Sequence, residues 1–178
     1  AAADHSHDAC LTLIVDGMDQ SKFKVPRWQG AKVKALDRFV RPALHVSGCW
    51  AHGYALHMAV SNADVPKDSN TNIEVISRML ETVHCQRKKL PQHLHLQLDN
   101  SSTENKNQKM FRFCIALVQA GGFRSVCMSF LRKGHTHEDI DGVFGQLALT
   151  IAHAEFDTIS DVIGILVRRL RTVGVDET

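Results

Sequence analysis

The sequence predicts an α/β domain with a mixed sheet of about five strands flanked by helices. Short apolar runs rich in β-branched residues alternate with longer stretches in which apolar residues recur at helical spacing. Acids stand where several of these elements begin or end, at Asp16, Asp99 and Asp141. The 178 residues, 44% of them hydrophobic, suffice for one domain with a sizeable core. Any chemistry is therefore expected where the strands end.

We expect the domain to span residues 11–153, with a disordered stub at 1–10 and a C-terminal helix within 154–178 that packs on it. No apolar run reaches membrane-spanning length and no signal peptide is visible, so no membrane partner is expected. The five cysteines show no CxxC spacing and fall mostly within apolar runs, which favours reduced, buried thiols in an intracellular compartment. The chain starts without Met and reaches a strand almost at once, as expected for a domain excised from a longer protein.

The first strand is the apolar run that ends at Asp16, and Gly17 follows it. A carboxylate at the end of a buried strand costs free energy unless it is paired or binds a cation. An Asp-Gly pair can also simply open a turn. Asp16 is the first candidate for chemistry because two further acids follow later elements.

Residues 18–42 form a basic connection without clean periodicity, with one short helix expected at 31–38. A solvated surface is the simplest explanation of such charges. They are also candidates for phosphate contacts, namely Lys22, Lys24, Arg27, Lys32 and Lys34.

Residues 44–60 are expected to be extended, as one bent strand or two, with Gly48 and Gly53 as bends or a hairpin turn. A helix is expected over 71–86, where Thr71 and Glu74 have capping-box spacing. Its apolar stripe consists of Ile73, Ile76, Leu80 and Val83.

Residues 94–98 alternate leucines with polar residues, as in a strand with one apolar face. Asp99 continues the polar face at the carboxyl end, which is where ligands bind in open α/β sheets. A helix over 104–119 follows, and its nearly all-apolar stretch 110–118 is expected to be buried. Residues 124–131 form the next predicted strand.

The run from Lys133 to Asp141 is the densest cluster of potential ligands and proton carriers in the chain. Thr136 is a suitable cap for a helix with three acids in its first turn and an apolar stripe at Val143, Phe144, Leu147 and Ile151. Acids in a first turn can simply complement the helix dipole, but that does not account for His135 and His137. A last helix is expected over 158–171, capped by Thr158.

Asp16, Asp99 and Asp141 are too far apart in the chain to meet through local structure. They meet if the first strand and the 94–98 strand are parallel neighbours, which the intervening crossover helix favours, and if the acidic helix crosses their carboxyl ends. A hard divalent cation relieves the repulsion among converging carboxylates. Two such ions support phosphodiester chemistry.

The order of elements and several short motifs resemble the ribonuclease H-like superfamily. Within it, the chain is similar to transposase-like domains carried by mobile elements of eukaryotes, over roughly residues 11–153. The matching motifs are Asp16-Gly17, Leu98-Asp99-Asn100, Glu104-Asn105-Lys106-Asn107, and Lys133-Gly134-His135 leading through Thr136-His137-Glu138-Asp139-Ile140 to Asp141.

The resemblance implies a nuclease or polynucleotidyl transferase that uses two Mg²⁺ or Mn²⁺ ions on nucleic acid, DNA above all, in the nucleus. Asp16, Asp99 and Asp141 carry over as metal ligands, and His135 as a proton shuttle. The spacing before Asp141 is shorter than in ribonuclease H, which leaves Glu138 and Asp139 as alternatives for the third ligand. Glu138 lies one helical turn from Asp141 and can share its site.

Two other classes of function fit parts of the sequence. A zinc module could use the pairs Cys49 with His52, His93 with His95, or His135 with His137, but none repeats at zinc-finger spacing. A domesticated transposase domain that binds nucleic acid or protein without cutting would keep the same fold. Metal-dependent cleavage separates an active site from this inert alternative.

Overall fold

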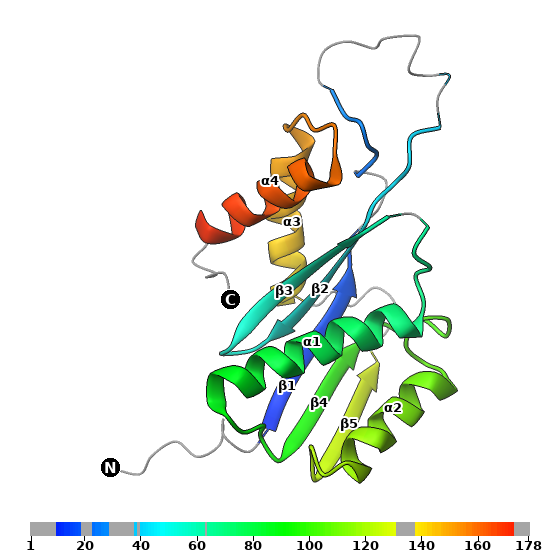
Figure 1. Cartoon of the computed structure of the whole chain (residues 1–178), viewed down its shortest axis with the longest axis vertical. Helices are drawn as coiled ribbons and strands as arrows, with labels where there is room; N and C mark the ends of the chain where they lie inside the picture. Colours follow the sequence, from blue (N-terminus) through cyan, green and yellow to red (C-terminus); the bar gives the residue numbers. More distant parts are fainter. Residues whose placement is uncertain are drawn as a thin grey trace.

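The computed structural model describes residues 10–18, 23–28, 38, 40–62, 64–130 and 138–172. A five-stranded sheet forms the centre of the molecule, with strand order β3-β2-β1-β4-β5 (Figure 1). The strands are β1 (Cys10–Gly17), β2 (His45–Ala51), β3 (Ala55–Ser61), β4 (His93–Leu98) and β5 (Ser125–Phe130). The helices are α1 (Ser69–Arg87), α2 (Gln108–Gln119), α3 (Glu138–Ala152) and α4 (Ile159–Thr172).

The sheet is mixed, as the sequence predicts, and β1 lies at its centre. β1 pairs antiparallel with β2 and parallel with β4, and β4 pairs parallel with β5. The 44–60 stretch is two strands joined at Gly53, whose φ of +77° suits glycine in a tight turn. Gly48 is no bend: it lies within β2, opposite Asp16.

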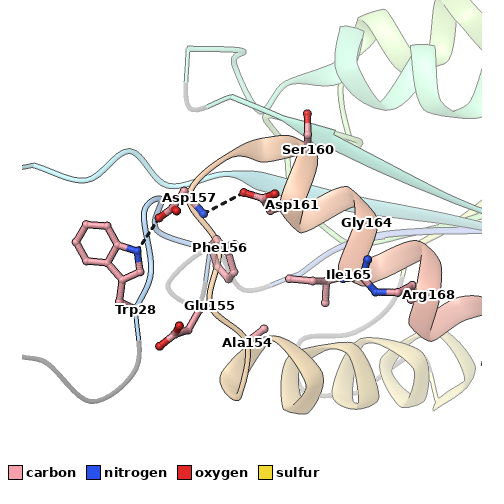
Figure 2. A pocket seen from close by; sticks show the side chains of 10 residues that line it. All are labelled: Trp28, Ala154, Glu155, Phe156, Asp157, Ser160, Asp161, Gly164, Ile165 and Arg168. Carbon is pink, nitrogen blue, oxygen red and sulfur yellow. Dashed lines mark hydrogen bonds between the residues drawn. The ribbon is translucent and has the colours of Figure 1, made fainter.

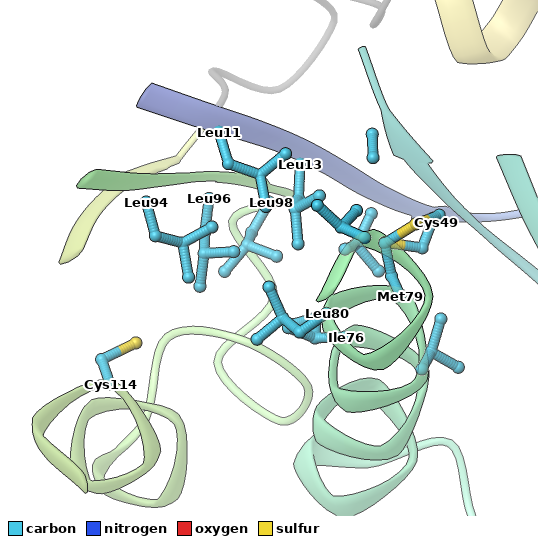
Figure 3. Close-up of a cluster of buried hydrophobic side chains, with 14 of the residues drawn as sticks. Leu11, Leu13, Cys49, Ile76, Met79, Leu80, Leu94, Leu96, Leu98 and Cys114 are labelled. Atoms are coloured by element: carbon cyan, nitrogen blue, oxygen red, sulfur yellow. The ribbon is translucent and has the colours of Figure 1, made fainter. Parts of the chain in front are cut away.

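One face of the sheet packs against α1 and α2 (Figure 1). Leucines of β1 and β4 point towards Ile76, Met79 and Leu80 of α1 (Figure 3). The predicted stripe of α1 is therefore confirmed.

The expected burial of 110–118 is wrong, because α2 lies at the edge of the sheet with only Met110 and Cys114 buried. Its outer face exposes Phe111, Ile115 and Val118.

The opposite face packs against α3 and α4 through a second apolar cluster. Ile14 of β1 lies in this cluster with Ile140 and Phe144 of α3. A Cβ on Gly48 would lie 2.9 Å from the Phe144 ring, so this glycine permits the close approach of α3 to the sheet. The predicted stripe of α3 is confirmed by the burial of Phe144, Leu147 and Ile151.

Two predicted helix starts are wrong. The N-cap of α1 is Asp68, whose carboxylate accepts hydrogen bonds from the amides of Asn70 and Thr71, so Thr71 is inside the helix. α2 begins at Gln108, after its cap Asn107, because 104–107 are held in the preceding loop. The predicted cap Thr158 of α4 is confirmed: its Oγ1 accepts the Asp161 amide at 3.2 Å.

All five cysteines are free, but only Cys49 and Cys114 are buried, so the expectation of generally buried thiols is wrong. Cys10, Cys85 and Cys127 are exposed. None of the described helices has the length and apolar character needed to cross a membrane.

Candidate active site at the carboxyl edge of β1 and β4

The structure brings Asp16 and Asp99 to neighbouring positions. The parallel register of β1 and β4 runs up to Val15 opposite Leu98, so the next residue on each strand is an acid. Side chains alternate along a strand, and both acids follow a leucine or valine that faces α1. Asp16 and Asp99 therefore share the same edge of the sheet, and both are half-buried.

A chain of hydrogen bonds holds Asp99. Its Oδ1 accepts a short bond from Asn105 Nδ2 and a bond of 3.2 Å from the Ser101 amide. Asn105 Oδ1 in turn accepts Asn72 Nδ2 of α1 at 2.8 Å. Asn72 and Asn105 are 6% and 2% exposed, so both amides are interior groups that need these partners.

Glu104 is a third carboxylate at this edge; the resemblance includes it in a motif but assigns it no role. Burial raises the pKa of the Glu104 carboxyl above its ordinary value, and the negative charges of Asp99 and Asp16 raise it further. The positive charge of Lys67 lowers the pKa of Glu104, because Lys67 Nζ lies 3.4 Å from Glu104 Oε1. The charges of both strand-end acids thus reach Glu104.

Lys67 brings a positive charge to the same edge. A Cβ on Gly17 would lie 3.1 Å from Lys67 Nζ, so the ammonium stands directly beside the residue that follows Asp16. Its side chain is 35% exposed and that of Glu104 is 16% exposed. Lys67 therefore offsets part of the negative charge at the ends of β1 and β4.

The loop between β4 and α2 gives each residue of the 104–107 run a separate role. Glu104 pairs with Lys67, Asn105 holds Asp99, and Lys106 Nζ lies 5.7 Å from the centre of the Phe130 ring. Asn107 caps α2 and donates to Ser69 Oγ at 2.6 Å. The sequence offered one indication of this network: Asn72 lies four residues before Ile76, on the buried side of α1.

The third predicted ligand is less closely placed. Asp141 lies in the first turn of α3 and is half-buried. Its neighbour Ile140 approaches within 3.1 Å of the position of a Cβ on Gly48, the β2 residue opposite Asp16. Within the described residues, however, no three carboxylate, imidazole or thiol groups are close enough to hold a metal ion. His135 lies outside the described residues, as do the side chains of Glu138 and Asp139.

The predicted basic contacts are only partly described. Lys22, Lys32 and Lys34 lie outside the described residues, as does nearly all of the expected helix at 31–38. Lys24 is exposed. Arg27 Nη2 donates to the Ala152 carbonyl at 3.1 Å, so this arginine ties its segment to the end of α3.

The zinc alternative finds no support in the part of the chain that the structure describes. Cys49 is buried among core side chains, and its burial raises the pKa of the thiol to about 12, which disfavours the thiolate that binds zinc. His93 and His95 instead hydrogen-bond the hydroxyls of Ser125 and Ser129.

A hollow of about 600 Å³ lies elsewhere, beside the start of α4 (Figure 2). Trp28 Nε1 donates to Asp157 Oδ1 at 2.6 Å on its rim. Asp161, which also lines it, accepts the amides of Asp157 and Thr158. None of the acids at the ends of β1 and β4 lines this hollow; of its own acids, Asp157 binds Trp28 and Asp161 caps the start of α4.

The sheet order and the helices on its two faces define a ribonuclease H-like fold of the kind seen in transposase catalytic domains. The catalytic domain of Mos1 mariner transposase is similar with a TM-score of 0.55 and 9% identity, over 94% of this chain and 72% of that one. The Mos1 transposase paired-end complex with left transposon end is similar with a TM-score of 0.55 and 9% identity, over 94% of this chain and 49% of that one. The Mos1 strand transfer complex is similar with a TM-score of 0.52 and 12% identity, over 95% of this chain and 48% of that one. The chain thus spans about half of the transposase chains in those complexes.

The chain belongs to the DUF7869 family, a domain of unknown function, whose profile matches residues 34–173. The comparison with curated proteins finds no match.

Proposed function

We propose that this domain cleaves or transfers phosphodiester bonds in nucleic acid, DNA above all, by a metal-dependent reaction. The observation that supports it most is the juxtaposition of Asp16 and Asp99 at the carboxyl ends of two parallel neighbouring strands. The solved transposases with this fold include complexes with transposon ends. We further propose that the protein acts on DNA in the nucleus.

The donor set fits Mg²⁺ or Mn²⁺, because it consists of hard carboxylate oxygens without thiolates. Asp16 and Asp99 would hold the metal, with Asp141 as the third ligand and Glu138 or Asp139 as its alternatives. Bound there, two ions would supply an activated water or hydroxyl and would stabilise the leaving oxygen of a phosphodiester. The protein's own part is to keep the carboxylates at one edge and to bring His135 as a proton carrier. The basic residues of 22–34 would contact phosphates.

The inert alternative has its own support. The described residues contain no preformed three-ligand group, and the Lys67 ammonium lies beside Gly17 at the same edge. A domain that only binds nucleic acid or protein would keep this arrangement. Titration with Mg²⁺ or Mn²⁺ separates the two proposals.

The test is plasmid cleavage with Mn²⁺ by the wild type and by the Asp99→Asn variant. This substitution keeps the oxygen that accepts Asn105 but removes the charge, so we expect the fold to persist and cleavage to stop. Asp161→Asn, at the start of α4, is the matched control and should cut at the wild-type rate. Cleavage that is unaffected by Asp99→Asn, or absent from the wild type with both metals, would reject the proposal.

A further inference from the structure

Asn72 and Asn105 form a buried amide relay between α1 and the acidic edge. Asn72 Nδ2 donates to Asn105 Oδ1 at 2.8 Å, and Asn105 Nδ2 donates to Asp99 Oδ1. Because the Asn105 oxygen is taken by Asn72, its amide nitrogen must face Asp99. The relay thus fixes which way the second amide points.

Burying two amides at this place costs more free energy than burying two apolar side chains would. Position 72 lies on the apolar side of α1, where a leucine would bury more apolar surface without polar groups to satisfy. Two buried amides are tolerable only when both are fully hydrogen-bonded, which ties their side chains to one arrangement. That arrangement ends on the carboxylate of Asp99.

We propose that Asn105 is a positioning residue, which Asn72 orients and which holds the Asp99 carboxylate ready for a divalent cation. This inference rests on the proposed function. Both hydrogen bonds to Asp99 reach Oδ1, from Asn105 and from the Ser101 amide. No hydrogen bond from the described part of the chain reaches Oδ2, so that oxygen is the one offered to the metal.

The test compares Asn105→Leu with the double variant Asn72→Leu/Asn105→Leu. The single variant leaves the Asn72 amide buried without its partner and should lower the melting temperature. The double variant replaces both partners with apolar groups of similar size, and should recover much of that loss. Asn70→Ala is the matched control, because Asn70 lies on the same helix but is exposed, and its side chain donates to Asp68 rather than to the relay.

Mn²⁺ affinity is measured by calorimetry, and the Asp99 rotamer by crystal structures of the metal-free variants. Loss of an outer hydrogen-bond partner of a metal ligand weakens binding about tenfold to a hundredfold. We expect that loss in both leucine variants, with Asp99 in altered or multiple rotamers, and no change in Asn70→Ala. A merely structural role predicts instead that the double variant, once its stability returns, regains Mn²⁺ affinity.

The outcomes distinguish this inference from the proposed function. A stable double variant that binds Mn²⁺ like the wild type and keeps a single Asp99 rotamer would overturn the positioning role alone. A wild type that binds no Mn²⁺ would reject the metal-dependent function. In that case the Asp99 rotamer in the double variant still decides whether Asn105 positions the carboxylate.

Discussion

The acids at the ends of β1 and β4 and the acids at the start of α4 have the same chemistry but opposite surroundings. Asp161 accepts hydrogen bonds from the Thr158 hydroxyl and from the amides of Thr158 and Asp157, which lower the pKa of its carboxyl. At the sheet edge, burial and neighbouring acids raise the pKa of Glu104. Carboxylates at the helix start stabilise the fold, whereas those at the sheet edge repel one another. An acidic residue indicates a binding site only after its structural hydrogen bonds are accounted for.

The strongest way to break this comparison is to neutralise one acid in each region. Asp16→Asn should reduce Mn²⁺-dependent cleavage by about a thousandfold or more, because a neutral amide is a weak metal ligand. Asp161→Asn should leave cleavage unchanged and lower the melting temperature slightly, because it weakens the cap of α4. Plasmid nicking and thermal unfolding measure the two effects. Equal loss of cleavage in both variants would mean that the two regions do not differ as described.

The second prediction concerns the third ligand. Asp141→Asn should abolish cleavage while Glu138→Gln leaves at least a tenth of it, if Asp141 completes the site. The repulsion relieved by removing an anion should leave the melting temperature unchanged or raised. Nicking rates with saturating Mn²⁺ give the ranking. Wild-type rates in Asp141→Asn would transfer the role to Glu138 or Asp139.

The smallest effect concerns the pH dependence of stability. The raised pKa of Glu104 means that its protonated form is favoured in the folded state, so its stabilising contribution is present below the ordinary pKa of 4.5 and is lost as the pH rises through the raised value. In EDTA, Glu104→Gln should therefore lose less stability than the wild type as the pH rises above about 4.5. Urea unfolding at several pH values measures the difference. A steeper loss in the variant would show that the Lys67 ion pair outweighs burial and the neighbouring acids.

Much of the fold follows from periodicity in the sequence. Alternating leucines at 94–98 predict a strand with one buried face. Because a helix separates this strand from the earlier apolar runs, the sequence also predicts that β4 pairs in parallel with β1. The burial of α2 did not follow, because an apolar composition does not reveal that a helix lies at the edge of a sheet. The cap of α1 was misplaced because Asp68 and Thr71 are both capable caps within one turn of each other.

The candidate site was predictable in part for a related reason. Asp16 and Asp99 each follow an apolar strand directly, so their positions depend only on strand pairing. Glu104 and Asn105 belong to a loop, and loop side chains acquire partners only through tertiary structure. Lys67 and Asn72 come from a different part of the chain, and no local pattern relates them to Asp99. A polar residue on the apolar side of a helix, as at Asn72, was the one available clue.

The absence of a side chain at Gly48 lets α3 pack close to β2, and the position of Asp141 depends on that packing. A methyl group there would lie 2.9 Å from the Phe144 ring and 3.1 Å from Ile140, so these side chains or α3 itself would have to move. The first turn of that helix contains Asp141, and the strand beneath it contains Asp16. If Asp141 completes the proposed metal site, the absence of a side chain at Gly48 helps α3 to bring that acid towards Asp16, and core packing would then help to set the geometry of the site.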